Sequence, residues 1–156
     1  MSRMDLKALR DASEVIAEFA GLTDLVGTPV RFTVRRHRPD GAWLIELAPH
    51  LLALAQAVDV RAFAEGILAV LEQGAGERDF RLVNDDSCDA YTRIGYEGEE
   101  LYFTAGVYFD VTQAVGSSAQ DEPLSSTSID HLELEYVSPA DPRHLTRCAR
   151  ALLAAL

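Results

Sequence analysis

The sequence is poor in cysteine and lysine and contains no long apolar run. Its two cysteines, Cys88 and Cys148, are 60 positions apart, which fits neither a disulfide framework nor a zinc-site spacing. Two reduced thiols are therefore expected, although a bridge between them stays open. No apolar run approaches the roughly 20 residues of a membrane-spanning helix. Lysine occurs once, at Lys7, against 13 arginines, and this bias indicates a GC-rich bacterial genome.

The first residues also lack a targeting signal. Residues 1–7 lead directly into a pattern with a charge every few positions, which is not a signal peptide. The expected location is the cytoplasm, with no membrane partner.

Catalytic and cofactor-binding motifs are missing as well. There is no G-x-S-x-G elbow, no Walker loop, no G-x-G-x-x-G after a strand and no HExxH helix. The four histidines are not paired at metal-ligand spacing. A calcium loop beginning at Asp85 would need glycine and glutamate where Ala90 and Tyr96 stand. We therefore expect no catalytic residue, no metal and no cofactor, and non-catalytic binding is favoured over an enzyme.

Negative charge is concentrated in one part of the chain. Residues 77–135 hold 14 acidic and 3 basic residues, a net charge of −11, which equals that of the whole protein. Residues 1–76 sum to −2 and residues 136–156 to +2. A field of one sign repels nucleic acid and attracts cationic partners. Improved solubility is the competing explanation.

Hydrophobic periodicity predicts the elements of the first half. Apolar residues at three- and four-residue spacing indicate a helix over 4–20. Alternation on both sides of the Arg38–Gly41 turn predicts a hairpin over 29–48. A helical stretch is expected at 51–56, then a helix from an Asp59 N-cap to Gln73. Gly66, inside that helix, is interpreted as a site of close packing against a sheet.

The sequence of the second half predicts a meander of strands followed by a helix. Strands are predicted at 80–83, 90–96, 100–111 and 128–137, and a mobile loop at 113–128. A closing helix is expected over 141–156, with Asp141-Pro142 as its cap. The order α-β-β-α-β-β-β-β-α predicts one α+β domain over 1–156, with a mostly antiparallel sheet and helices packed on one face.

The predicted contact surface consists of acidic residues and tyrosines of this meander. Tyrosine beside carboxylates suits protein recognition, because it supplies rigid area and a hydroxyl group. The same tyrosines could line a small-molecule pocket or pack beneath a helix. The candidate partner-binding residues are Asp85, Asp86, Asp89, Tyr91, Glu97, Glu99, Glu100, Tyr102 and Tyr108.

The size, the acidic tyrosine-bearing strands between Asp85 and Asp110 and the lack of catalytic motifs resemble small bacterial immunity proteins. That resemblance implies a protein that neutralises a cationic toxin. The helices at 4–20 and 141–156 and the hairpin at 29–48 are also similar to type III secretion chaperones, which implies an effector partner and a homodimer. In that alternative Arg31, Arg35, Val30, Phe32 and Trp43 would form the contacts.

Overall fold

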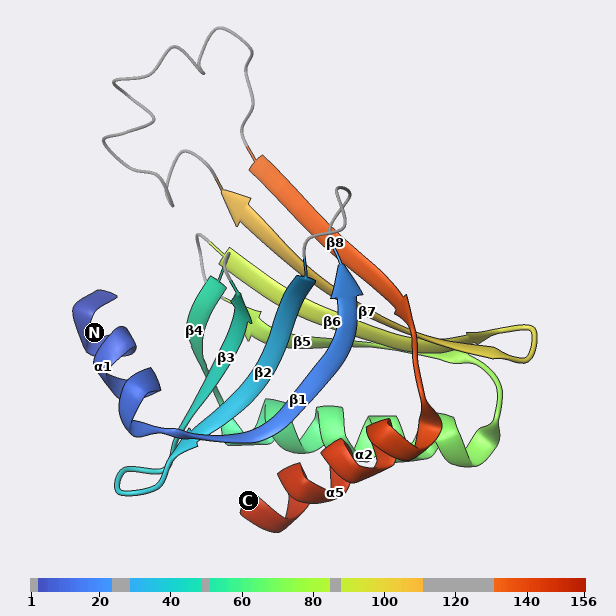
Figure 1. Cartoon of the computed structure of the whole chain (residues 1–156), viewed down its shortest axis with the longest axis horizontal. Coiled ribbons are helices and arrows are strands. Elements are labelled where there is room, and N and C mark those ends of the chain that lie inside the picture. Colours follow the sequence, from blue (N-terminus) through green and yellow to red (C-terminus); the bar gives the residue numbers. More distant parts are fainter. Residues whose placement is uncertain (1–2, 24–28, 49–50, 85–87, 111–130) are drawn as a thin grey trace, which may run out of the picture.

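The computed structural model describes residues 3–23, 29–48, 51–84, 88–110 and 131–156, and these residues form helices and antiparallel strands (Figure 1). The predicted loop at 113–128 lies outside the described residues. In chain order the elements are α1 (Arg3–Ala12), β1 (Glu14–Thr23), β2 (Pro29–His37), β3 (Ala42–Ala48), β4 (Leu51–Ala55), α2 (Ala57–Gln73), β5 (Glu77–Asn84), β6 (Cys88–Glu97), β7 (Glu100–Asp110), β8 (His131–Pro139) and α5 (Pro142–Ala155).

The same order of elements occurs twice. Strands β1 to β4 form one four-stranded antiparallel meander that is followed by α2, and β5 to β8 form a second that is followed by α5. Helices α2 and α5 contact one another beneath the two sheets (Figure 1). The α+β class and the antiparallel connectivity are confirmed, and the predicted succession is found with two further strands in it.

A cluster of phenylalanines joins the two sheets. Phe19 of β1 stacks on Phe103 of β7 with ring centroids 4.8 Å apart. Phe32 of β2 meets the same two rings edge-on, at 5.4 and 5.8 Å. Phe63 of α2 lies 5.5 Å from Phe19. Burying each of these rings contributes about 1.5–3 kcal/mol through apolar area alone, so this cluster is the centre of a core that both sheets and both helices share.

Helix α2 packs closely on the second sheet at Gly66. A β-carbon at this position would lie 2.1 Å from Cζ of Phe80, so only glycine fits against the ring. The predicted close approach to a sheet is confirmed. The helix ends at Gly74, whose φ of 66° is left-handed and favours glycine. Its N-cap is Gln56, and Asp59 lies in the first turn instead.

Helix α5 is fixed at both ends. The Asp141 carboxylate accepts a 3.0 Å hydrogen bond from the backbone N–H of Arg143, so the predicted cap is confirmed. At the other end Arg36 of β2 donates a hydrogen bond to the carbonyl of Ala155 and lies over the Trp43 ring. A cation at a helix C-terminus satisfies unpaired carbonyls and the helix dipole.

Two helical predictions in the first half are wrong. The helix predicted over 4–20 ends at Ala12, where the Ser13 hydroxyl donates to the carbonyl of Arg10. Residues 14–23 instead form β1, because pairing with β2 buries Ala17 and Phe19 on one side of an extended strand. The stretch at 51–56 is strand β4, paired with β3.

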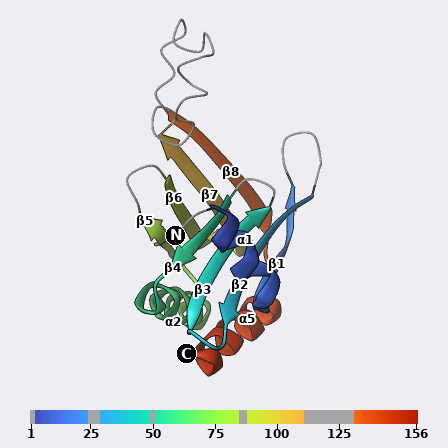
Figure 2. The ribbon, with the colours of Figure 1, turned by 90° about the vertical axis from the view of Figure 1, so that its left-hand side faces the viewer.

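Helix α1 lies apart from the other helices. It contacts β2 and β4 of the first sheet (Figure 2), so only α2 and α5 share one side of the molecule. None of the helices in the described ranges has the length and apolar character needed to cross a membrane.

We expect Gly66→Ala to destabilise the protein by about 1–3 kcal/mol, because the new methyl group overlaps the Phe80 ring. Helix propensity alone predicts the opposite sign, about 1 kcal/mol of stabilisation. In a Phe80→Ala background the same substitution should therefore become stabilising. Urea unfolding of the four proteins of this cycle measures both effects, and stabilisation by Gly66→Ala in the native background would contradict the packing assignment.

Candidate functional site

Charged side chains on the outer face of the first sheet form ion pairs with one another and with α1. Glu46 on β3 accepts from Arg10 of α1 at 3.2 Å and from Arg35 of β2 at 3.4 Å. Arg31 binds Glu18 at 2.8 Å. Arg38 at the hairpin turn pairs with Glu14. Arg31, Arg35 and Arg38 of this hairpin therefore serve intramolecular ion pairs, which leaves them less available to a partner.

The outer face of the second sheet is open among the described residues. Phe80, Leu82, Ala90 and Val107 point toward the core or α2, so the alternating residues of the same strands point outward. The strand register places these outward residues in rows across the sheet. One row contains Arg81, Tyr91, Gly106 and Glu135, and the next contains Asp89 and Tyr108.

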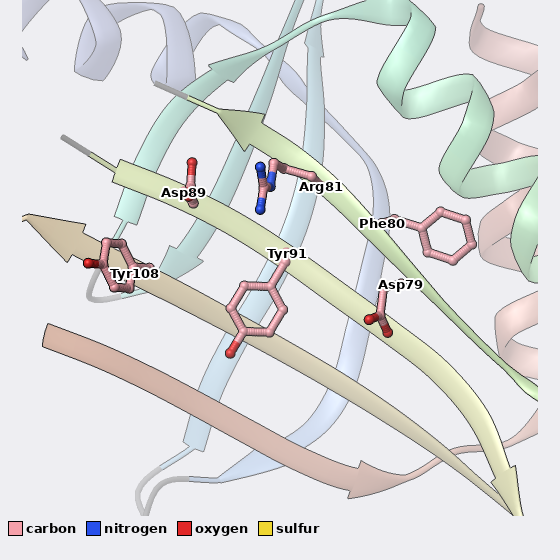
Figure 3. A pocket seen from close by; sticks show the side chains of 6 residues that line it. All are labelled: Asp79, Phe80, Arg81, Asp89, Tyr91 and Tyr108. Atoms are coloured by element: carbon pink, nitrogen blue, oxygen red, sulfur yellow. The ribbon is translucent and has the colours of Figure 1, made fainter. Parts of the chain in front are cut away.

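A hollow of about 410 Å³ lies on this face (Figure 3). Residues of three neighbouring strands line it, and the Phe80 ring points away from it toward α2. The lining residues are Asp79, Phe80, Arg81, Asp89, Tyr91 and Tyr108. The hollow therefore combines two tyrosines with charges of both signs.

Tyr91 is held in place by a glycine and a glutamate. A β-carbon on Gly106 would lie 2.2 Å from Cζ of Tyr91, so the ring crosses β7 at a position where only glycine leaves room. The Tyr91 hydroxyl then donates a 2.8 Å hydrogen bond to Oε2 of Glu135 on β8. An aromatic ring that covers a strand glycine also fixes the strand register. Tyr91 thus forms a rigid wall of the hollow.

The charged groups of the hollow differ in their partners. Asp79 accepts a 2.7 Å hydrogen bond from Arg93, and this bond raises the pKa of the arginine. Asp89 is half-buried, and its Oδ1 is buried without a hydrogen-bond partner among the described residues. Arg81 is exposed, and the described part of the chain offers it no ion pair within 4.0 Å. Asp89 is therefore the carboxylate with unused hydrogen-bonding capacity.

A second acidic group lies at the β6–β7 turn. Glu97, Glu99 and Glu100 are exposed there, around Gly98 with its left-handed φ of 66°. The hydroxyl of Tyr102 donates to the Glu100 carboxylate. This bond, together with the negative charges of Glu100 and Glu97, raises the pKa of the tyrosine, so its hydroxyl stays protonated and neutral at physiological pH.

The predicted contact residues therefore form two groups. Asp89, Tyr91 and Tyr108 line the hollow, whereas Glu97, Glu99, Glu100 and Tyr102 lie at the turn. Asp89 and Glu97 are eight residues apart on β6, which corresponds to about 26 Å of extended strand. Asp85 and Asp86 lie outside the described residues.

Sequence reasoning missed several residues of this face. Asp79 and Arg81 alternate with Phe80 on β5, which is the signal that marks them as outward-facing. Their closeness to Asp89 and Tyr91 depends on the strand register. Glu135 precedes the buried Tyr136 on β8, which marks it as outward-facing, but its bond to Tyr91 depends on β8 lying beside β7.

Cys148 and His144 form a contact that resembles a catalytic pair but has the wrong chemistry. Sγ of Cys148 lies 3.6 Å from Nε2 of His144. That nitrogen lies 2.8 Å from the carbonyl oxygen of Glu18, to which it must donate its proton, so it is not available as a base. Burial raises the pKa of the Cys148 thiol to about 11. A neutral thiol beside an occupied imidazole is a structural element of the core.

Neither a metal-binding group among the described residues nor a similar known protein indicates a function for this chain. Within the described residues, histidine, cysteine and carboxylate side chains form no group of three that could hold a metal ion. No protein-family model, curated protein or solved structure matches the chain.

We expect Gly106→Ala to displace the Tyr91 ring, because the added methyl group would overlap its Cζ and hydroxyl atoms. Loss of the Tyr91–Glu135 bond and local overpacking should cost about 1–3 kcal/mol of stability. Thermal unfolding measures this cost. Tyr91→Ala removes the overlap and serves as the control, since Gly106→Ala should be nearly neutral in that background.

The raised pKa of Cys148 predicts slow alkylation and a defined pH dependence. At pH 8 the buried thiol should react with iodoacetamide at least about a hundredfold more slowly than an unfolded thiol. Folding favours the neutral thiol, so this stabilisation is present below about pH 9 and is lost as the pH rises toward about 11. Peptide mass mapping and unfolding at several pH values test both points. Cys148→Ala should lack this component of the alkaline loss.

Proposed function

We propose that this chain is a non-catalytic binding protein that covers a cationic protein partner with the outer face of β5 to β8, as an immunity protein covers a toxin. The supporting observation is the difference between the two sheets. The first sheet satisfies its arginines and carboxylates internally. The second leaves a hollow with an unpartnered Asp89 oxygen and an acidic turn exposed, within the described residues.

Charge complementarity supports a cationic partner. Carboxylates of the outer face and its turn outnumber the two arginines there, Arg81 and Arg93, and Arg93 is engaged by Asp79 and Glu77. Complementary potentials steer association and suppress wrong partners. The carboxylates of this surface with described side chains are Glu77, Asp79, Asp89, Glu97, Glu99, Glu100 and Glu135.

The spacing of the two acidic groups supports a macromolecular partner. The hollow and the β6–β7 turn are separated by about 26 Å of strand. A standard protein interface covers about 800 Å² on each partner, a patch roughly 28 Å across. One protein therefore spans both groups, whereas a small molecule contacts only one of them.

Tyrosines supply the less polar part of this surface. Tyr108 is 36 % exposed, and the half-buried Tyr91 and Tyr102 lie on the same face. Binding energy in protein interfaces concentrates on such residues when they are surrounded by polar groups. Tyr96 differs from them because it packs against the core.

The secretion-chaperone alternative receives less support. Its apolar contact residues, Val30, Phe32 and Trp43, are buried in the core, with exposed fractions of 3 %, 1 % and 3 %. Arg31 and Arg35 are paired with Glu18 and Glu46. A small-molecule function remains compatible with the hollow, although Tyr102 does not line it.

The test is binding to the proteins encoded by the genes on either side of its own. We expect one of them to be a basic protein that co-purifies with this chain and whose toxicity on expression is suppressed by it. Affinity from calorimetry should fall steeply with ionic strength. Lys substitutions at Glu97 and Glu99 should weaken binding at least about tenfold, or about 1.4 kcal/mol.

The matched control reverses the charge of two exposed glutamates on α2 by placing lysine at Glu65 and Glu72. It changes the net charge by the same amount as the test variant. This control variant should keep nearly full affinity. Equal losses in both double variants would indicate a non-specific charge effect and would contradict the proposed face.

A further inference from the structure

We propose that the hollow on the second sheet receives an arginine side chain, with the Asp89 carboxylate as its counter-ion. The inference rests on the proposed function only in naming a protein partner as the source of this arginine. The recognition itself is a property of three neighbouring strands and does not depend on the acidic turn.

Asp89 supplies the first reason. Its Oδ1 is buried and has no hydrogen-bond partner among the described residues. This burial leaves the carboxylate partly desolvated, and a cation bound in the hollow that the residue lines offsets the cost of its charge. A guanidinium group is planar and more weakly hydrated than an ammonium group, so it suits a partly desolvated carboxylate beside aromatic rings better.

The tyrosines supply the second reason. Tyr108 lies directly opposite Asp89 in the strand register, and Tyr91 is two residues along β6 on the same face. A guanidinium held at Asp89 would therefore lie beside aromatic rings, which attract planar cations. The volume of about 410 Å³ is within the range of pockets that bind small ligands, so one arginine side chain fits.

The other charged residues of the hollow determine whether a substitution there strengthens or weakens arginine binding. Asp79 is already bound to Arg93, so it contributes only to the local potential. Arg81 is exposed and repels an incoming cation, and its long side chain can turn toward solvent. Removal of Arg81 should therefore strengthen arginine binding. A ligand held through its own carboxylate would show the opposite effect.

The experiment titrates the ¹⁵N-labelled full chain with Nα-acetyl-arginine amide, which has no other charge. The uncharged citrulline analogue, which has nearly the same shape, is the control. We expect shifts at β5 and β6 amides with a dissociation constant on the order of 1 mM. The citrulline analogue should bind at least about tenfold more weakly.

Three variants complete the test. Asp89→Asn should weaken arginine-amide binding about tenfold, whereas Arg81→Gln should strengthen it about two- to threefold. Glu65→Gln on α2 should leave it unchanged. The same amide spectra report whether each variant remains folded, and Arg81→Gln provides an independent readout if Asp89→Asn does not fold.

The outcomes separate this inference from the proposed function. Equal binding of both analogues, no effect of Asp89→Asn, or loss of binding in Arg81→Gln would each overturn the arginine site. Loss in Arg81→Gln would indicate an anionic ligand. If the probe binds as expected but no basic protein partner is found, the site stands and the proposed function fails. If a basic protein partner binds but the probe does not, the proposed function stands and the arginine site fails.

Discussion

The stacking of Phe19 on Phe103 is the contact on which the remaining structure depends. Within the described strands the two meanders share no hydrogen-bonded pair, so side-chain packing is the main interaction that holds them together. Phe32 and Phe63 surround the stacked pair and connect it to β2 and α2. The α2–α5 contact adds a second connection between the halves. Without this aromatic cluster, each sheet would lose the surface against which its inner face packs.

The same core determines what the outer face presents. Inward Phe103, Ala105 and Val107 fix the register of β7, so Tyr102, Gly106 and Tyr108 must face outward. A slip of one residue would exchange the two sets and bury tyrosine hydroxyls without partners. The positions of the hollow and of the acidic turn are therefore consequences of hydrophobic packing on the opposite side of the sheet.

Much of this arrangement could be predicted from periodicity. Alternation along 101–109 is unambiguous, and Gly66 indicated close packing correctly. Strand β1 could not be predicted, because the spacing of Ile16 and Phe19 also fits a helix and only pairing with β2 decides. The hollow could not be predicted, because its lining depends on the β5–β6 register, which shifts between Arg81 and Val83. Local patterns identify outward residues but not their neighbours across the sheet.

The contrast between the two sheet faces has a consequence for how such a protein can change. Helix α1 and a set of ion pairs cover the first face, so substitutions there disturb internal contacts. Outward residues of the second sheet, such as Arg81 and Tyr108, contribute little to the shared core. The proposed recognition surface and the internally paired surface thus lie on the two different sheets of one repeated order of elements. Substitutions at outward positions of the second sheet can therefore alter the proposed partner specificity while the core that both sheets share is preserved.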